Sequence, residues 1–413
     1  MDLLNSGDTA FMLVCAALVF LMTPGLAFFY GGLGRRKNMV NNLMASFFIL
    51  GLGVVLWYAF GYSLAFNGDT LGFVGDFGKA FLRGVGVEEM SGSIPELAFV
   101  GFQMTFALIT PALITGSVAG RMKFGALFLF IALWSLVCYY PLAHMVWGGG
   151  LLGTGWLNSV DFAGGNVVHI NAGVTGLVLA IILGRRIGYE QISYRVHNVP
   201  FVMLGAGLLW FGWYGFNAGS AGAANGLAAH AFVTTSVAAA AALLSWMLID
   251  VIKQGKPTAV GAATGIVVGL VAITPAAGFV PVWASLIIGL LVSPICYFGV
   301  LLVKKTLKID DSLDAFGCHG IGGIWGGVAT GLFANHTINE VATPGLVYGE
   351  WRQFGAQLLS IVITIVVAAV GTLICAGLVR LVTSLRVERR DELIGLDLSQ
   401  HGEAAYPSFN GLD

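Results

Sequence analysis

Long stretches without a charged residue constrain this chain more than any other feature of its sequence. The clearest of them are residues 99–120, 264–303 and 358–378. An α-helix rises about 1.5 Å per residue and the hydrocarbon core of a bilayer is about 30 Å thick, so each stretch is long enough to cross it. Charged residues make up only 10% of the chain, whereas a soluble domain carries about 25%. The sequence therefore predicts an all-α, polytopic membrane protein.

Apolar stretches separated by polar breaks predict about eleven membrane-spanning helices. Their approximate positions are 9–32, 41–66, 97–119, 124–144, 165–184, 199–219, 228–251, 259–277, 282–303, 316–334 and 354–383. Residues 1–8 lack the positively charged start of a cleaved signal peptide, so the first stretch is interpreted as a retained helix. Residues 1–385 are thus expected to form a membrane domain, followed by a tail at 386–413.

Basic residues fall almost entirely in alternate breaks between these spans. Of the 20 Lys and Arg residues, only Lys79, Arg83 and Arg352 lie in the other set of breaks. Cytoplasmic loops carry the excess of basic residues in membrane proteins. The N-terminus is therefore predicted to lie outside and the tail in the cytoplasm. This arrangement requires an odd number of spans, which agrees with eleven.

Two histidines mark a weak internal repeat. Glycines follow His169 at 173 and 176, and glycines follow His319 at 323 and 326, with the same offsets. The two histidines lie in the fifth and tenth spans, and an offset of five spans inverts the second copy relative to the first. The predicted halves are about 9–184 and 199–334, with the last helix at about 354–383 outside the repeat.

These two histidines are also the first candidates for chemistry. An ionisable side chain at membrane depth is costly, so it usually faces a cavity and a partner. Two neutral imidazoles can share a hydrogen bond and offer a polar contact to a small hydride such as ammonia in an apolar pore. The alternative is that His169 and His319 separately cap helices or bond carbonyl groups. Sequence spacing alone does not show whether the rings touch.

Two carboxylates precede the histidines. Asp161 lies eight residues before His169, and Asp314 lies five residues before His319. A carboxylate at a helix start accepts backbone N–H groups and also raises the local affinity for cations. We expect structural roles for both, with an indirect effect of Asp161 on cation attraction.

Aromatic residues gather near the predicted outer ends of several spans. Aromatic belts at membrane interfaces are common, and this interpretation covers most of the ten tryptophans. An aromatic face attracts a cation by about 0.5–2 kcal/mol, which suits a site that must also release its ion. Three glycines follow Trp147, and Ser220 could supply an oxygen acceptor, which is compatible with a cation-recruiting vestibule. The aromatic candidates are Phe102, Phe106, Trp147, Trp213 and Phe216.

Several longer motifs closely resemble the ammonium transporter (Amt/Mep/Rh) family, in order and over essentially the whole chain. In the first half they are Phe29-Tyr30-Gly31-Gly32-Leu33, Phe102-Gln103-Met104-Thr105-Phe106-Ala107, His144-Met145-Val146-Trp147-Gly148-Gly149-Gly150 and Asp161-Phe162-Ala163-Gly164-Gly165 with Val168-His169-Ile170-Asn171. In the second half they are Gly212-Trp213-Tyr214-Gly215-Phe216-Asn217-Ala218-Gly219-Ser220-Ala221, Thr274-Pro275-Ala276 and Asp314-Ala315-Phe316-Gly317-Cys318-His319-Gly320.

The resemblance implies a homotrimer with a pore inside each subunit, in the cell membrane. Trp147, Ser220 and Phe106 would form an outer ammonium recruitment site, and Phe106 and Phe216 would stack below it as a gate. His169 and His319 would be the twin histidines of a hydrophobic pore. Asp161 matches an acidic residue of the family that acts mostly through structure.

The tail at 395–406 resembles the cytoplasmic terminus of Amt proteins, which responds to a PII-type regulatory protein. The alternative is an inert polar tail. Trp147 and this tail favour the Amt branch over the Rh branch, and methylammonium is an expected further substrate from the resemblance.

The mechanism expected from this pattern is recruitment of ammonium as a cation, deprotonation near the phenylalanine gate and passage of ammonia past the histidines. The proton would either travel separately along the histidines or stay outside. Two alternatives remain, a passive ammonia or carbon dioxide channel of the Rh type and an ammonium sensor. No enzyme, cofactor, metal site or nucleic-acid partner is expected, because no matching motif is present and the net charge is −1.

Overall fold

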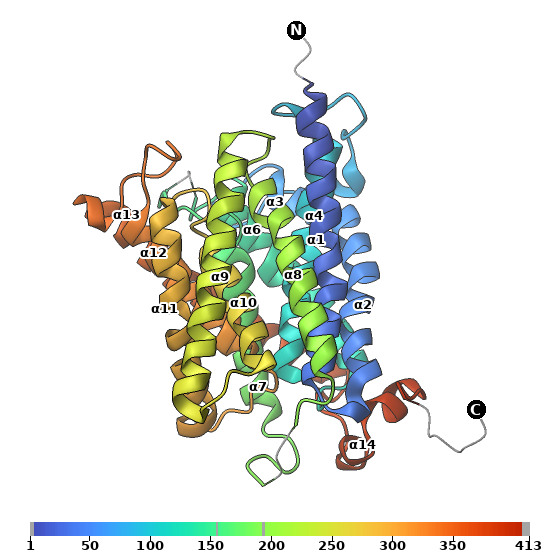
Figure 1. Cartoon of the computed structure of the whole chain (residues 1–413). Helices are drawn as coiled ribbons and strands as arrows, with labels where there is room; N and C mark the ends of the chain where they lie inside the picture. The colour runs from blue at the N-terminus through green and yellow to red at the C-terminus, as the bar shows by residue number, and fades with distance from the viewer. Residues whose placement is uncertain (1–3, 154–155, 192–194, 407–413) are drawn as a thin grey trace.

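The computed structural model describes residues 4–153, 156–191 and 195–406 and consists of long helices that run side by side between two ends (Figure 1). Residues 407–413 of the predicted tail lie outside the described residues. The described helices are α1 (Ser6–Leu33), α2 (Met39–Leu56), α3 (Tyr62–Phe66), α4 (Glu96–Val118), α5 (Phe124–Trp134), α6 (Tyr140–Trp147), α7 (Asn171–Leu183), α8 (Val199–Gly219), α9 (Gly226–Gln254), α10 (Ala259–Ile273), α11 (Val282–Leu301), α12 (Ile321–Phe333), α13 (Trp351–Val382) and α14 (Arg389–Ile394).

Short π-helical segments join or begin several of these helices. Segment η2 (Trp57–Gly61) joins α2 to α3, and η4 (Ser135–Tyr139) joins α5 to α6. Segments η5 (Gly165–Ile170) and η7 (Phe316–Gly320) begin α7 and α12, while η6 (Leu302–Thr306) ends α11. A two-stranded hairpin of β1 (Met90–Ser91) and β2 (Ile94–Pro95) precedes α4, with Met90 opposite Pro95.

The predicted all-α, polytopic fold is confirmed. In the described part of the chain, each of the eleven predicted stretches contains a helix, and nine helical rods are long and apolar enough to cross a membrane. Helix α10 is shorter, and α12 with η7 is not among the nine. The eighth stretch was predicted to reach 277, but α10 ends at Ile273 because Pro275 cannot continue a helix.

Glycines let the helices approach closely. Helices α1 and α8 form the most extensive pair. A Cβ atom at Gly205 would lie 2.4 Å from the backbone nitrogen of Phe29, and one at Gly32 would lie 2.6 Å from the carbonyl oxygen of Asn198. Small residues allow such contact where lipid gives helices no hydrophobic reason to associate.

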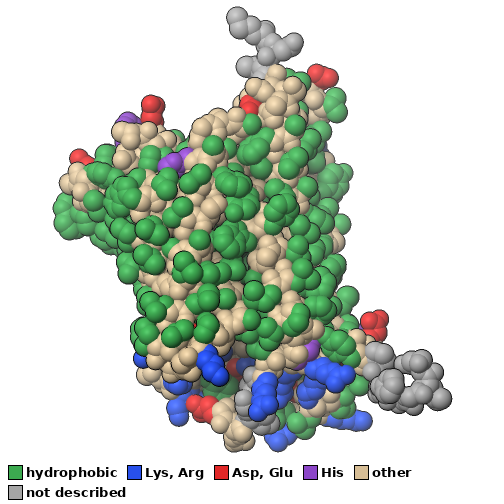
Figure 2. Space-filling view, in the orientation of Figure 1, with side chains coloured by type: hydrophobic (Ala, Val, Ile, Leu, Met, Phe, Trp, Pro, Cys, Tyr) green, Lys and Arg blue, Asp and Glu red, His purple; other side chains and the backbone are tan. Residues whose placement is uncertain are grey.

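The face of the molecule shown in Figure 2 has an apolar middle, and its charged side chains lie near the two ends. Leucine and valine side chains on α9 and α13 face outward, with Leu244, Leu248 and Leu373 more than half exposed. Lys and Arg side chains gather at the end that holds α14, here called the basic end, and the N-terminus lies at the opposite end. The structure thus brings the loops that carry most of the basic residues to one end of the bundle. That this end faces the cytoplasm remains a prediction.

Candidate functional site

The two predicted histidines lie against each other in the centre of the molecule. His169 belongs to η5 and His319 to η7, and the two side chains are 1% and 2% exposed. Their Nδ1 atoms are 3.3 Å apart and their rings are nearly parallel, at 15°. At this separation one Nδ1 donates a hydrogen bond and the other accepts it. The alternative of two separately bonded histidines is therefore wrong.

The repeat-matched glycines explain how the two histidines meet. A Cβ atom at Gly173 would lie 2.3 Å from the backbone nitrogen of Gly320, and one at Gly323 would lie 3.0 Å from Cβ of His169. The starts of the two helices therefore cross in direct backbone contact. Both histidines also sit in π-helical turns, which in α-helices occur frequently at functional sites.

A narrow, mostly apolar cavity contains the histidine pair. Its volume is about 10 Å³, close to the minimum space that holds a single water molecule. Trp213 stacks on His169 at 5.4 Å and donates its indole N–H to Thr274 Oγ1 at 2.8 Å. The Nε2 atom of His169 has no hydrogen-bond partner among the described residues. The cavity is lined by Met22, Leu26, Ile109, Leu113, Val168, His169, Leu209, Trp213, Phe216, Val267 and His319.

Two stacked phenylalanines separate this cavity from the end that holds the N-terminus. The rings of Phe106 and Phe216 are 4.1 Å apart at 22°, and both side chains are buried. Phe216 lines the histidine cavity, and Phe106 lines a wider pocket on the other side. The stacked rings therefore form an apolar barrier between two spaces.

The wider pocket, here called the outer vestibule, has a volume of about 290 Å³. Trp147 stands edge-on to Phe106, with centroids 5.8 Å apart, and donates its indole N–H to the carbonyl oxygen of Asp161 at 2.9 Å. The hydroxyl of Ser220 donates to the carbonyl oxygen of Phe216 at 2.8 Å, which leaves its oxygen able to accept. Phe102 also lines this space. An aromatic face and an oxygen acceptor thus border one pocket.

The carboxylate of Asp161 holds the start of η5 in place. It accepts hydrogen bonds from the backbone N–H groups of Gly164, Gly165 and Asn166, at 2.8, 2.6 and 2.7 Å. Burial raises the pKa of this carboxyl, and the N–H groups act in the opposite direction. These contacts fix the backbone three to five residues before His169, as a structural role of Asp161 would require.

The matching carboxylate in the second half is Asp311, which sequence reasoning missed. It accepts from the backbone N–H groups of Ala315 and Phe316, at 3.2 and 2.8 Å, and from the hydroxyl of Ser117 at 2.7 Å. Asp311 lies eight residues before His319, the same offset as Asp161 to His169, and that equality could have found it. Asp314 instead forms an ion pair with Lys304 at 2.6 Å.

A third cavity lies at the basic end, beyond the histidines. It has a volume of about 710 Å³ and is lined by Cys318, the neighbour of His319, and by Leu313 among others. The chain thus places an aromatic vestibule, a phenylalanine barrier, a narrow cavity with two histidines and a wide cavity in succession. Such an arrangement can attract a small cation at one end, and it admits only a small molecule to the centre.

Comparisons with known proteins give one consistent result. The profile of the Ammonium Transporter Family matches residues 10–406. The "Ammonium transporter" of Bacillus subtilis (strain 168) is 48% identical over 98% of this chain and 99% of its own length. Among solved structures, Saccharomyces cerevisiae Mep2 has a TM-score of 0.88 at 35% identity, covering 98% of this chain and 93% of that one. A "Sensor Amt Protein" has a TM-score of 0.87 at 27% identity, covering 96% and 98%.

Proposed function

Because this chain belongs to the ammonium transporter family, we propose that it recruits ammonium in the outer vestibule and conducts ammonia past His169 and His319. The observation that carries this proposal is the pair of histidine Nδ1 atoms 3.3 Å apart behind the stacked rings of Phe106 and Phe216. The sequence of this chain is 48% identical to that of a transporter and 27% identical to that of the sensor, which favours transport over sensing.

Selectivity follows from the difference between ammonium and potassium. The two ions have equal charge and similar size, so attraction to Trp147 and Asp161 does not separate them. A bare cation is strongly disfavoured in an apolar cavity at membrane depth. Ammonium escapes this penalty because it can break one N–H bond, leave the electron pair on nitrogen and continue as neutral ammonia.

The histidine pair is proposed to carry the released proton separately. Each imidazole has one donor and one acceptor nitrogen, and a proton moves between them when the donor and acceptor roles exchange along the Nδ1–Nδ1 contact. The Nε2 atom of His169, which has no partner among the described residues, is available to a guest in the narrow cavity. Net charge then crosses together with ammonia.

The proposal also covers the orientation of the molecule in the membrane, its assembly and its regulatory partner. The basic end would face the cytoplasm, because cytoplasmic loops hold the excess of Lys and Arg. The subunits would assemble as a homotrimer in the plasma membrane, with one pore in each. A PII-type regulatory protein would act on the tail at the basic end. These assignments rest on the family and on the sequence pattern.

The test is an ammonium jump on purified protein reconstituted in liposomes on a solid-supported membrane, with potassium as the control ion. We expect a current with ammonium and none with potassium. His169→Ala and His319→Ala should abolish the current or its selectivity. His230→Ala is the matched control. His230 lies near the start of α9, bonds the carbonyl oxygen of Val280, and is not among the described lining residues of the histidine cavity or the outer vestibule.

Two outcomes would contradict parts of this proposal. Selective ammonium currents of normal size in both histidine variants would remove the proton role of the pair. A rise of internal pH without any current would mean that neutral ammonia passes alone, as in a gas channel of the Rh type.

A further inference from the structure

The cavities at the two ends of the pathway differ sharply in charge. In the outer vestibule, Asp161 is the one charged side chain among the described lining residues. The cavity at the basic end, here called the inner vestibule, is lined by two acidic residues, Glu190 and Asp314, and by five basic ones. The basic residues are Arg35, Arg186, Arg195, Lys304 and Lys305.

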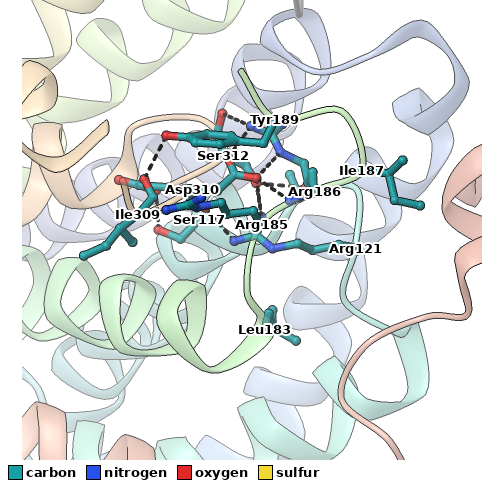
Figure 3. A network of polar contacts seen from close by, with 12 residues as sticks. Ser117, Arg121, Leu183, Arg185, Arg186, Ile187, Tyr189, Ile309, Asp310 and Ser312 are labelled. Atoms are coloured by element: carbon teal, nitrogen blue, oxygen red, sulfur yellow. Dashed lines mark hydrogen bonds and ion pairs between the residues drawn. The ribbon is translucent and has the colours of Figure 1, made fainter. Parts of the chain in front are cut away.

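Two of these basic residues, Arg186 and Lys304, take part in ion pairs. Arg186 bonds both carboxylate oxygens of Asp310, at 2.6 and 2.8 Å, and Lys304 pairs with Asp314 at 2.6 Å. Asp310 also lies 4.0 Å from Arg121, so its single negative charge is shared between two guanidinium groups (Figure 3). Among the described residues, this buried network includes neither Arg195 nor Lys305.

Arg195 and Lys305 contribute charge that faces solvent. Both side chains are exposed, and within residues 4–153, 156–191 and 195–406 no ion pair involves either of them. Low-dielectric walls focus the field of such groups into a cleft. At physiological ionic strength the Debye length is about 8 Å, so their field acts on an ion inside the cavity more than on one in bulk water.

A positively charged cavity affects ammonium and ammonia differently. It lowers the local concentration of ammonium but leaves neutral ammonia unaffected. We propose that the inner vestibule is a cation-excluding mouth, which makes the protein take up ammonium less readily from the basic end than from the opposite end. This inference rests on the proposed function.

Thermodynamics limits which measured quantity can show the difference between uptake from the two ends. A passive pathway carries no net flux when the electrochemical potentials on both sides are equal, whatever its charges. The asymmetry therefore appears in the ammonium concentration that gives half-maximal current from each side. A focused surface field changes local ion concentrations by about tenfold or more, and we expect a ratio of about ten at low salt.

The experiment uses excised membrane patches that contain the full chain, with ammonium perfused on either face. A protease site at the tail identifies which face holds the basic end. In the wild type, half-maximal current should need about ten times more ammonium at the basic end. Arg195→Glu with Lys305→Glu should bring the two values within about twofold of each other, and the double Gln variant should lie between.

The matched control is Arg389→Glu with Arg390→Glu. It makes the same change in charge at the same end, on two exposed residues of α14 that do not line the inner vestibule. Glutamate also suits the first turn of a helix, so α14 should persist. At physiological ionic strength, where the Debye length is about 8 Å, this control should keep the asymmetry of the wild type.

Salt gives a second measurement that needs no variant. The Debye length falls from about 30 Å at 0.01 M salt to about 3 Å at 1 M, so the asymmetry should be largest at low salt and should disappear at high salt. Equal half-maximal concentrations in the wild type at low salt would overturn the inference, as would an asymmetry that the Glu variant leaves intact or that the control also removes. Absence of ammonium current from both faces would instead contradict the proposed function itself.

Discussion

Trp147 offers the clearest contribution of a single side chain to substrate affinity. Its ring borders the outer vestibule beside Phe106, and its N–H group is already used by the carbonyl oxygen of Asp161. The aromatic face is therefore the part of the residue that remains for a cation. Cation–π attraction of about 0.5–2 kcal/mol corresponds to a factor of about 2–30 in binding.

We predict that Trp147→Leu raises the ammonium concentration for half-maximal current by about 2–30-fold and changes the maximal current little. Trp147→Phe is the matched control, since it loses the same hydrogen bond but keeps an aromatic face. Its half-maximal concentration should rise less. Titration of the current on the solid-supported membrane measures both, and an identical response of the two variants would exclude a role for the aromatic face.

The carboxylates that hold the histidine segments, Asp161 and Asp311, should contribute more to the stability of the protein than Asp314, which is in an ion pair. Asp161 and Asp311 each receive several hydrogen bonds in buried surroundings, whereas Asp314 is partly exposed. Hydrogen bonds to a charged group contribute about 1.5–3 kcal/mol each, and an exposed ion pair contributes about 1 kcal/mol or less.

We therefore predict that Asp161→Ala and Asp311→Ala each lower the free energy of unfolding by roughly 3 kcal/mol or more, while Asp314→Ala costs about 1 kcal/mol or less. The apparent midpoint of thermal unfolding in detergent, followed by tryptophan fluorescence, orders the three variants. A larger loss for Asp314→Ala than for Asp311→Ala would contradict the assignment of Asp311 as the partner of Asp161 in the repeat.

Residue-level prediction from sequence worked where two independent signals coincided. His169 and His319 stood out because their type is rare at membrane depth and their glycine offsets match. Asp311 was missed because its contacts, with two backbone N–H groups and with the hydroxyl of Ser117 on another helix, form only in the folded chain. Asp314 belongs to the motif that resembles the family and is closer to His319, so it drew attention first. The roles of Phe106 and Phe216 came only from the resemblance, since aromatic residues are common near membrane interfaces.

At the scale of elements, the crossing of α7 and α12 decides whether the histidines can meet. Gly173 sits where a Cβ atom would lie 2.3 Å from a backbone nitrogen and 2.5 Å from Cα of Gly320. Backbone cannot rotate away as a side chain can. An added methyl group must therefore push the two helix starts apart.

We predict that Gly173→Ala reduces ammonium current by at least tenfold, because the Nδ1 atoms no longer lie within hydrogen-bond distance. Gly377→Ala is the control, since Gly377 lies in α13 and a Cβ atom there would have no atom within 4 Å. Both variants should reach the membrane in similar amounts on immunoblots. Currents of wild-type size in Gly173→Ala would show that the crossing tolerates separation.

The helices themselves were largely predictable, and their irregular parts were not. Hydropathy locates spans because lipid requires every backbone group to bond within the segment. It does not distinguish an α-helical from a π-helical turn, so η5 and η7 were not foreseen. The sixth stretch was predicted at 199–219 and α8 occupies the same residues, whereas the fourth was predicted to end at 144 although α6 continues to Trp147.

At the scale of the whole molecule, the charge pattern predicted which loops share an end of the bundle, but no pattern predicted the cavities. The alternate breaks with basic residues indeed meet at one end (Figure 2). The volumes of the vestibules depend on how side chains from many helices pack, which no local pattern in the sequence records. The same holds for the contacts that the tail makes with the membrane domain.

The described part of the tail is held against the start of α2. Asp397 accepts a hydrogen bond from the backbone N–H of Asn41 at 2.9 Å, and the backbone N–H of Leu396 donates to the side chain of Asn38 at 2.9 Å. Lys37 bonds the carbonyl oxygen of Leu393 near the end of α14. Asp397 is thus a carboxylate at the N-terminus of a helix, where the helix dipole favours negative charge.

We predict that Asp397→Ala releases the tail from the membrane domain. Loss of a charge-assisted hydrogen bond worth about 1.5–3 kcal/mol should make the amide hydrogens of residues 389–401 exchange about 10–100 times faster. Glu403→Ala is the control, because Glu403 is exposed and bonds Asp397 only through its backbone N–H. Hydrogen exchange followed by mass spectrometry measures both variants in detergent. If exchange in α2 accelerates as much as exchange in the tail, Asp397 stabilises the helix start rather than the docking; if neither changes, the tail is held by the contacts of Lys37 and Asn38 instead.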